Sequence, residues 1–145
     1  MELILWRHAD AEEGAPDLER RLTKQGRKEA ARMAQWLRKR LPEDFEVISS
    51  PAVRARETAE ALEATVRIDN TLAPGAAPSA FVRASRWPSA ERTVIVVGHQ
   101  PDLGRALAHL VAAKQSDWRL QKGALWWLES GDAPLVKAAM SPDLL

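Results

Sequence analysis

Arg7 and His8, which stand side by side directly after a short apolar run, are the side chains of this 145-residue chain most able to do chemistry. The run over residues 3–6, Leu-Ile-Leu-Trp, predicts a buried strand. A guanidinium and an imidazole at the end of such a strand are costly to bury unless something pairs with them. A second apolar run, over residues 93–98, ends in the same way at His99. The two strand-end histidines therefore predict a functional site rather than unrelated core residues.

Polar residues also follow a third predicted strand. Residues 45–48 predict a short strand that ends at Ser49 and Ser50, and Arg54 lies one turn into the helix expected next. Parallel sheets collect functional groups at the carboxyl ends of their strands. The planar fork of arginine suits two phosphate oxygens at once, and a helix N-terminus attracts anions. The sequence therefore predicts a phosphate site with a candidate nucleophile inside it.

The elements that must position these residues alternate between strand and helix, which predicts an α/β layered domain. The clearest helix follows Thr23, a predicted N-cap, and its apolar residues recur at helical spacing until Pro42 ends it. Ser50 and Pro51 predict the start of a second helix over 53–64. The other predictions are strands over 65–68, 93–97, 124–128 and 135–139, a loop over 69–78, and helices over 79–87 and 101–111.

Composition excludes several classes of protein. The length predicts one domain over residues 1–145, and a formal net charge of +1 gives no long-range attraction to nucleic acid or a membrane. The chain has no cysteine, and its three histidines lie far apart in sequence, so we expect no thiolate chemistry and no dedicated metal site. No apolar run approaches about 18 residues. A cytoplasmic monomer without a cofactor is the default expectation.

Four ordered motifs resemble the histidine phosphatase (phosphoglycerate mutase-like) superfamily. They are Leu-Trp-Arg-His-Ala at 5–9, Leu-Thr-Lys-Gln-Gly at 22–26, Ser-Ser-Pro-Ala-Val-Arg-Ala-Arg-Glu-Thr-Ala at 49–59, and Val-Gly-His-Gln-Pro at 97–101. The short length, Ala9 after the first histidine, and the ending Met140-Ser141-Pro142 are most similar to the SixA-type phosphohistidine phosphatases. The resemblance implies a three-layer α/β/α domain with a mostly parallel central sheet.

The resemblance also implies a role for each matching residue. His8 would be the nucleophile that accepts the phosphoryl group, and Arg7 and Arg54 would bind its oxygens. His99 would stabilise charge in the transition state, and Gln100 would contact the substrate. Phosphoryl transfer needs mainly alignment and neutralisation of spread negative charge, which such groups supply. Because the attacking nitrogen of His8 must be neutral, its other nitrogen needs an acceptor, for which a backbone carbonyl is the expected group.

The chain departs from the family in its general acid. Mutase-like members usually carry a glutamate after the second motif, but residues 71–88 contain no Asp or Glu. Acid-phosphatase members place an aspartate after the second histidine, where this chain has Gln100. An alcohol leaving group needs an acid, whose help is worth about 10²- to 10⁴-fold, whereas an imidazole leaves more easily. A phosphohistidine on a protein is therefore the favoured substrate. Four acidic residues of the first loop could still supply a substitute acid: Asp10, Glu12, Glu13 and Asp17.

Other interpretations stay open from the sequence. The chain could be a broad small-molecule phosphomonoesterase of the same superfamily, or a phosphoprotein-binding module without turnover. Arg54 could pair with Glu57 on its own helix, a common surface arrangement. We expect the remaining polar and aromatic candidates to be structural. Arg56 is expected at the surface, His109 packed or at the surface, and Ser49 and Ser50 as caps. Most tryptophans are expected in the core, with Trp87 and Trp118 as weaker candidates for a partner surface.

Overall fold

One six-stranded sheet organises the computed structural model, which describes residues 1–145. The strand order is β3-β2-β4-β1-β5-β6, in which β1–β4, β4–β2 and β2–β3 pair in parallel and β5 and β6 are antiparallel. The predicted mixed, mostly parallel α/β fold is confirmed. The elements are β1 (Glu2–Arg7), α1 (Lys24–Arg38), β2 (Phe45–Ser49), α2 (Val53–Glu60), β3 (Val66–Ile68), α3 (Pro78–Ser85), β4 (Thr93–Gly98), α4 (Asp102–Ala112), β5 (Leu125–Glu129) and β6 (Leu135–Met140), with short 3-10 turns at Asp17–Glu19, Asn70–Leu72 and Pro142–Leu144.

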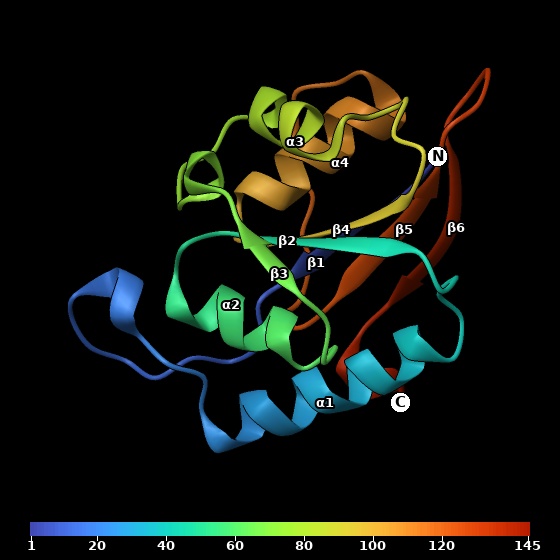
Figure 1. The fold of residues 1–145 in the computed structure, drawn as a ribbon. Coiled ribbons are helices and arrows are strands. Elements are labelled where there is room, and N and C mark those ends of the chain that lie inside the picture. The colour runs from blue at the N-terminus through green and yellow to red at the C-terminus, as the bar shows by residue number, and fades with distance from the viewer.

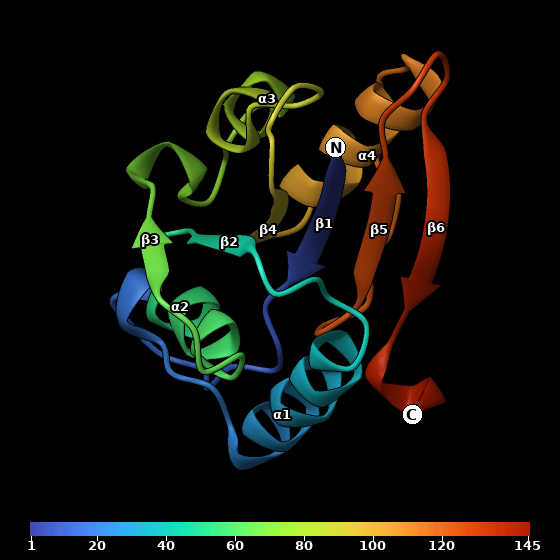
Figure 2. The same cartoon turned by 45° about the vertical axis from the view of Figure 1, so that its right-hand side comes forward.

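Helices cover both faces of this sheet, giving three layers. Figures 1 and 2 show α1 and α2 on one face and α3 and α4 on the other. Each face has its own core. Ile4 and Trp6 of β1 point into the core beneath α1 and α2, while Leu3 and Leu5 point into the core beneath α3 and α4. This alternation fills both faces of a central strand, which accounts for the continuous apolar run in the sequence.

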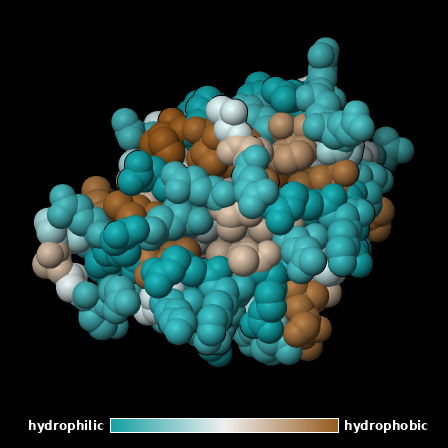
Figure 3. All heavy atoms as spheres, turned by 60° about the horizontal axis from the view of Figure 1, so that its bottom comes forward, coloured by the Kyte–Doolittle hydropathy of each residue, from teal (hydrophilic) through white to brown (hydrophobic).

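The first helix forms where its capping residue predicts. Thr23 accepts a hydrogen bond from the Gly26 amide, and Ala30, Met33, Ala34 and Leu37 are buried. The outer face carries the basic residues of the helix. Figure 3 shows the side of the molecule that α1 covers: it is mostly hydrophilic, with separated apolar areas. The basic face is thus a solvated face, opposite the buried apolar face of the helix.

The second helix begins at Val53, as predicted, but without the predicted cap. Ala52 is the N-cap of α2, without a side-chain hydrogen bond, and Pro51 lies before the helix. The Ser50 hydroxyl instead lies beside His99 and accepts a hydrogen bond from the Ala52 amide. The prediction that Ser50 caps a helix was wrong because Ser50 lies two residues before the N-cap, and its hydroxyl bonds the Ala52 amide and His99 rather than an amide of the first helical turn. The helix also ends at Glu60 rather than at residue 64, since the chain must turn back into β3.

The last two strands add an antiparallel extension to the sheet. Trp127 of β5 packs in the core beneath α1 and α2, whereas Trp126 packs against the other core. Both strands lie within a residue or two of their predicted ranges. None of the helices has the length and apolar character needed to span a bilayer.

Candidate active site

Three adjacent strands deliver the predicted site residues to one edge of the sheet. Because β4 lies between β1 and β2 and all run in parallel, their carboxyl ends coincide. The ladder continues past the strand ends, where the His8 amide donates to the Gly98 carbonyl at 3.1 Å and the Ser50 amide donates to the Val97 carbonyl at 3.0 Å. The rings of His8 and His99 consequently lie 5.2 Å apart between centroids, tilted by 56°.

His8 is buried and held in one tautomer. Its Nδ1 lies 2.7 Å from the Ala9 carbonyl oxygen, which can only accept, so Nδ1 carries the proton and Nε2 presents a lone pair. The Arg54 Nε–H points at that lone pair from 3.3 Å. Burial is the largest of the causes that lower the pKa of His8 to about 4, and the nearby guanidinium groups of Arg54 and Arg7 contribute to the same shift. The imidazole is therefore neutral near pH 7, as a nitrogen nucleophile must be.

Backbone contacts fix the segment that carries His8. The Ala9 amide donates to the Thr58 hydroxyl at 3.0 Å, and that hydroxyl donates to the Arg54 carbonyl at 2.8 Å, which joins the segment that carries His8 to α2. On the other side, the Gly123 amide donates to the His8 carbonyl at 3.1 Å. Thr58 and Gly123 thereby place the Ala9 carbonyl that selects the tautomer.

Arg54 lies one turn into α2 and is nearly fully buried. Its Nη1 donates to the Asp17 carbonyl at 2.7 Å, and its Nη2 pairs with the Asp17 carboxylate at 3.1 Å. The alternative partner, Glu57, instead pairs with Arg21 and accepts from the Leu22 amide. Asp17 thus holds the edge of the guanidinium made by its two η nitrogens, while Nε on the adjoining edge faces His8.

Arg7 approaches from the end of β1. Its Nη1 donates to the Leu120 carbonyl at 2.7 Å, which orients the guanidinium, while its buried Nε has no hydrogen-bond partner. Burial lowers the pKa of Arg7, although an arginine stays charged over the whole working range of pH. The side chain therefore presents a fixed positive charge with an unused donor.

His99 is the second buried imidazole. Its Nε2 lies 2.7 Å from the Ser50 hydroxyl, and its Nδ1 is buried without a partner. Burial is the largest of the causes that lower its pKa to about 3, and the neighbouring His8 and Arg54 contribute to the same shift. His99 is accordingly neutral near pH 7, so it can stabilise an anion only through an N–H group and not as an imidazolium.

Unsatisfied polar atoms concentrate here. The buried side-chain nitrogen and oxygen atoms without a partner are Arg7 Nε, Arg56 Nε and His99 Nδ1. Such atoms are rare because leaving one unpaired costs about 1–3 kcal/mol. Two of the three belong to Arg7 and His99. The arrangement is suited to a small anion that would accept hydrogen bonds from several directions.

Gln100 differs from the other candidates because both ends of its amide are already engaged. Its Nε2 donates to the Trp118 carbonyl at 2.9 Å, and its Oε1 accepts from the Gly104 amide at 2.7 Å. It joins the start of α4 to the segment that precedes β5. Its predicted contact with substrate stays a prediction.

The four acidic residues of the first loop differ in how they relate to the site. Asp10 pairs with Lys122 and accepts from the Thr23 hydroxyl, contacts that lower the pKa of its carboxyl. Glu12 and Glu13 are exposed. Only Asp17 contacts one of the predicted phosphate-binding arginines. A hydrogen bond from Arg20 is the largest cause that lowers the pKa of the Asp17 carboxyl, so this group is ionised near neutral pH.

The remaining candidates are structural. His109 is exposed, as expected, whereas Arg56 is half-buried and not a free surface residue. Trp87 and Trp118 are partly buried against the core, with Trp118 5.7 Å from Trp126 between ring centroids. Sequence reasoning missed the contact of Ser50 with His99. The only available signal was that this hydroxyl precedes a proline at a strand end.

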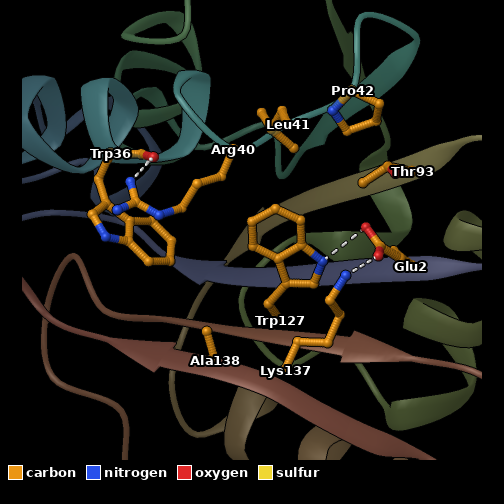
Figure 4. A pocket seen from close by; sticks show the side chains of 9 residues that line it. All are labelled: Glu2, Trp36, Arg40, Leu41, Pro42, Thr93, Trp127, Lys137 and Ala138. Carbon is orange, nitrogen blue, oxygen red and sulfur yellow. Dashed lines mark hydrogen bonds and ion pairs between the residues drawn. The ribbon is translucent and has the colours of Figure 1, made fainter.

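A large hollow in the surface lies elsewhere. It has a volume of about 720 Å³ and is bounded by Trp36 at the end of α1 and Trp127 of β5 (Figure 4). Glu2 also lines this hollow and accepts a hydrogen bond from the Trp127 indole at 3.1 Å. Since Glu2 begins β1 and His8 follows its last residue, the hollow is at the far end of the sheet from the candidate site. No group of three or more His, Cys, Asp or Glu side chains is placed to hold a metal ion.

The fold and the site together define an α/β protein with a neutral, buried histidine beside two arginines. Comparison with known proteins places it in a family. The sequence model described as "Histidine phosphatase superfamily (branch 1)" matches residues 3–76. An uncharacterized protein of Picosynechococcus sp. (strain PCC 7002) is 37% identical over 146 positions, which cover 92% of this chain and 87% of that protein. The chain belongs to the histidine phosphatase superfamily.

Solved structures agree with this assignment. The protein histidine phosphatase SixA complexed with tungstate superimposes with a TM-score of 0.84 at 26% identity, over 99% of both chains. A phosphoserine phosphatase from Entamoeba histolytica in complex with 3-phosphoglyceric acid gives a TM-score of 0.74 at 14% identity, over 97% of this chain and 96% of that one, and shares the fold alone. The predicted SixA-like fold is confirmed, and the family supports phosphatase activity.

Proposed function

We propose that this protein is a phosphohistidine phosphatase that works through a phosphorylated His8. The observation that carries the proposal is the tautomer of His8: the Ala9 carbonyl holds the proton on Nδ1, and the Nε2 lone pair faces Arg54. A neutral nitrogen beside a fixed positive charge is a nucleophile prepared for an anionic phosphoryl group. In this proposal Arg7 and Arg54 bind the phosphoryl oxygens, and His99 donates to the charge that develops on them.

The reaction runs in two displacements. In the first, the Nε2 lone pair of His8 forms a bond to phosphorus as the bond to the leaving group breaks, and the leaving nitrogen takes a proton from solvent. In the second, a water oxygen attacks phosphorus, the bond from phosphorus to Nε2 breaks, and inorganic phosphate leaves. Each step needs in-line alignment and neutralised oxygen charge more than covalent assistance, which matches a site made of two guanidiniums and a neutral imidazole.

A phosphohistidine carried by a protein is the proposed substrate. An alkyl ester would need an acid in the site to protonate its leaving alcohol. The one carboxylate in contact with Arg54 is that of Asp17, and its ion pairs with Arg20 and Arg54 keep it ionised. An imidazole leaving group needs little acid assistance. The similarity to a protein histidine phosphatase at 26% identity supports the same choice.

Hydrolysis of small phosphate esters is the second candidate. The Asp17 side chain is 56% exposed, so a substrate that displaced Arg20 could let this carboxyl take up a proton and act as the acid. A binding module without turnover is less well supported, because binding alone does not require the lone pair of His8 to face Arg54.

The test measures two things on the same protein sample: the rate of phosphate release from each substrate and the formation of a phosphorylated intermediate. We expect wild-type protein to take phosphate from a phosphohistidine protein faster than from an alkyl phosphomonoester, and to form a phosphoprotein that survives base and is lost in acid. His8→Ala should form none and show no turnover, whereas His109→Ala, at an exposed histidine, should behave as wild type. Full turnover by His8→Ala would overturn the nucleophile, and preference for the alkyl ester would overturn the substrate class.

A further inference from the structure

We infer that Ser50 fixes the tautomer of His99, so that a neutral imidazole presents its Nδ1–H to the phosphoryl group. This inference rests on the proposed function and adds a positioning residue to it. Ser50 is fully buried, and its hydroxyl lies 2.7 Å from His99 Nε2. It does not touch the phosphoryl group in this scheme, since it acts through the ring of His99.

The direction of the Ser50–His99 hydrogen bond follows from what surrounds the hydroxyl. Its oxygen already accepts a hydrogen bond from the Ala52 amide at 3.2 Å, and His99 Nε2 is the only acceptor within reach of its hydrogen. A buried hydroxyl hydrogen without an acceptor would carry the cost of an unmade hydrogen bond. The hydroxyl therefore donates to Nε2. In a neutral imidazole the proton then sits on Nδ1.

The other nitrogen of His99 is available to a bound anion. Nδ1 is buried and has no partner in the protein, in a side chain that is 3% exposed. An N–H that finds no acceptor in its own chain is available to an oxygen of a bound anion. The pair Arg7 Nε and His99 Nδ1 would then contribute two donors to one phosphoryl group, which accounts for both unpaired atoms at once.

The two histidines of the site thus perform opposite tasks with the same protonation state. The Ala9 carbonyl places the proton of His8 on Nδ1 and leaves the Nε2 lone pair to attack. The Ser50 hydroxyl places the proton of His99 on Nδ1 and directs that N–H at the oxygens. Without Ser50, His99 could adopt the Nε2–H tautomer. Its Nδ1 would then present a lone pair, rather than a hydrogen-bond donor, to the phosphoryl oxygens.

Nitrogen-15 NMR of the imidazoles tests the tautomer directly. In wild-type protein at pH 7, we expect His99 to show a protonated Nδ1 and a bare Nε2. In Ser50→Ala, we expect the pattern to shift toward Nε2–H or a mixture. We expect kcat to fall by about 10- to 100-fold, somewhat less than the loss of a whole transition-state donor costs, because part of the population keeps the Nδ1–H tautomer. Ser49→Ala is the matched control, because it removes a neighbouring buried hydroxyl that donates to the Ser50 carbonyl.

The outcomes separate this inference from the proposed function. An Nε2–H tautomer in wild-type His99 overturns the inference without any variant, even if a phosphorylated His8 is found. An unchanged kcat and spectrum in Ser50→Ala also overturns it. Ser50→Thr keeps a hydroxyl and should retain the wild-type tautomer; a shift there as large as in Ser50→Ala counts against the inference. If wild-type protein forms no phosphoprotein, the proposed function fails instead, and the NMR result still reports on the tautomer.

Discussion

The two buried histidines make a quantitative prediction about stability and pH. Burial lowers the pKa of His8 to about 4 and that of His99 to about 3, from an ordinary value of 6.5. Between pH 6.5 and these values, the unfolded chain binds protons that the folded chain does not. Stability therefore falls as the pH falls below 6.5, and this loss ends only once the folded histidines titrate.

The expected size follows from the same numbers. One pKa unit corresponds to about 1.4 kcal/mol, and at pH 5 a histidine with an unfolded pKa of 6.5 that stays neutral in the folded state costs about 2 kcal/mol. With both histidines, the free energy of unfolding should be lower at pH 5 than at pH 7 by about 4 kcal/mol, an order-of-magnitude figure. Carboxylates with lowered pKa values, such as Asp10 and Asp17, add to the loss only at lower pH.

Urea unfolding at pH 7, 6 and 5 measures this loss. His99→Asn should remove about half of the pH dependence. His109→Gln, which changes an exposed histidine, should retain nearly all of it. A difference below about 1 kcal/mol between pH 7 and pH 5 in the wild type, or an unchanged slope in His99→Asn, would refute the reasoning that burial keeps these imidazoles neutral.

Two further changes test how the site is held. Asp17→Asn should lower kcat/KM by about 10-fold, because Arg54 loses its charged partner and is held less firmly. In a series of aryl and alkyl phosphates, this loss should be the same for every leaving group. A loss that is largest for poor leaving groups would instead assign Asp17 as the general acid. Gly26→Ala should destabilise the protein by about 1–3 kcal/mol in urea unfolding, since the added Cβ would lie 2.1 Å from the Asp10 carbonyl oxygen. Gly131→Ala, where the nearest atom would be 3.5 Å away, is the control, and equal effects of the two glycine changes would contradict the packing argument.

Much of the fold was predictable because its signals are local. The apolar runs that became β1 and β4 and the capped, periodic α1 are encoded in a few neighbouring residues. The capping of α2 was not predictable in the same way. Its apparent cap, Ser50, is engaged by His99 from 49 positions along the chain. No local pattern reports a partner that only the folded sheet brings near.

The candidate site likewise has a part that the sequence predicts and a part that it does not. Strand ends and motif order predict that His8, Arg54 and His99 come together, since parallel strands share one carboxyl edge. The groups that hold them in place are set by packing. The sequence could not show that the Ala9 carbonyl would fix the tautomer of His8, or that Asp17, left open as a general acid, would pair with Arg54. Residue types point to the chemistry, whereas the tautomers and pairings depend on contacts between distant segments.

The hydrogen-bond ladder that runs past the ends of β1 and β2 has a consequence for how the site opens. The amides of Arg7, His8 and Ser50 donate to Ala124, Gly98 and Val97, so the functional segment belongs to the same cooperative unit as the central strands. Such amides exchange with solvent only when that unit unfolds. The backbone geometry of the candidate site at His8 and Ser50 should therefore persist until the sheet itself unfolds, and heat inactivation should coincide with global unfolding.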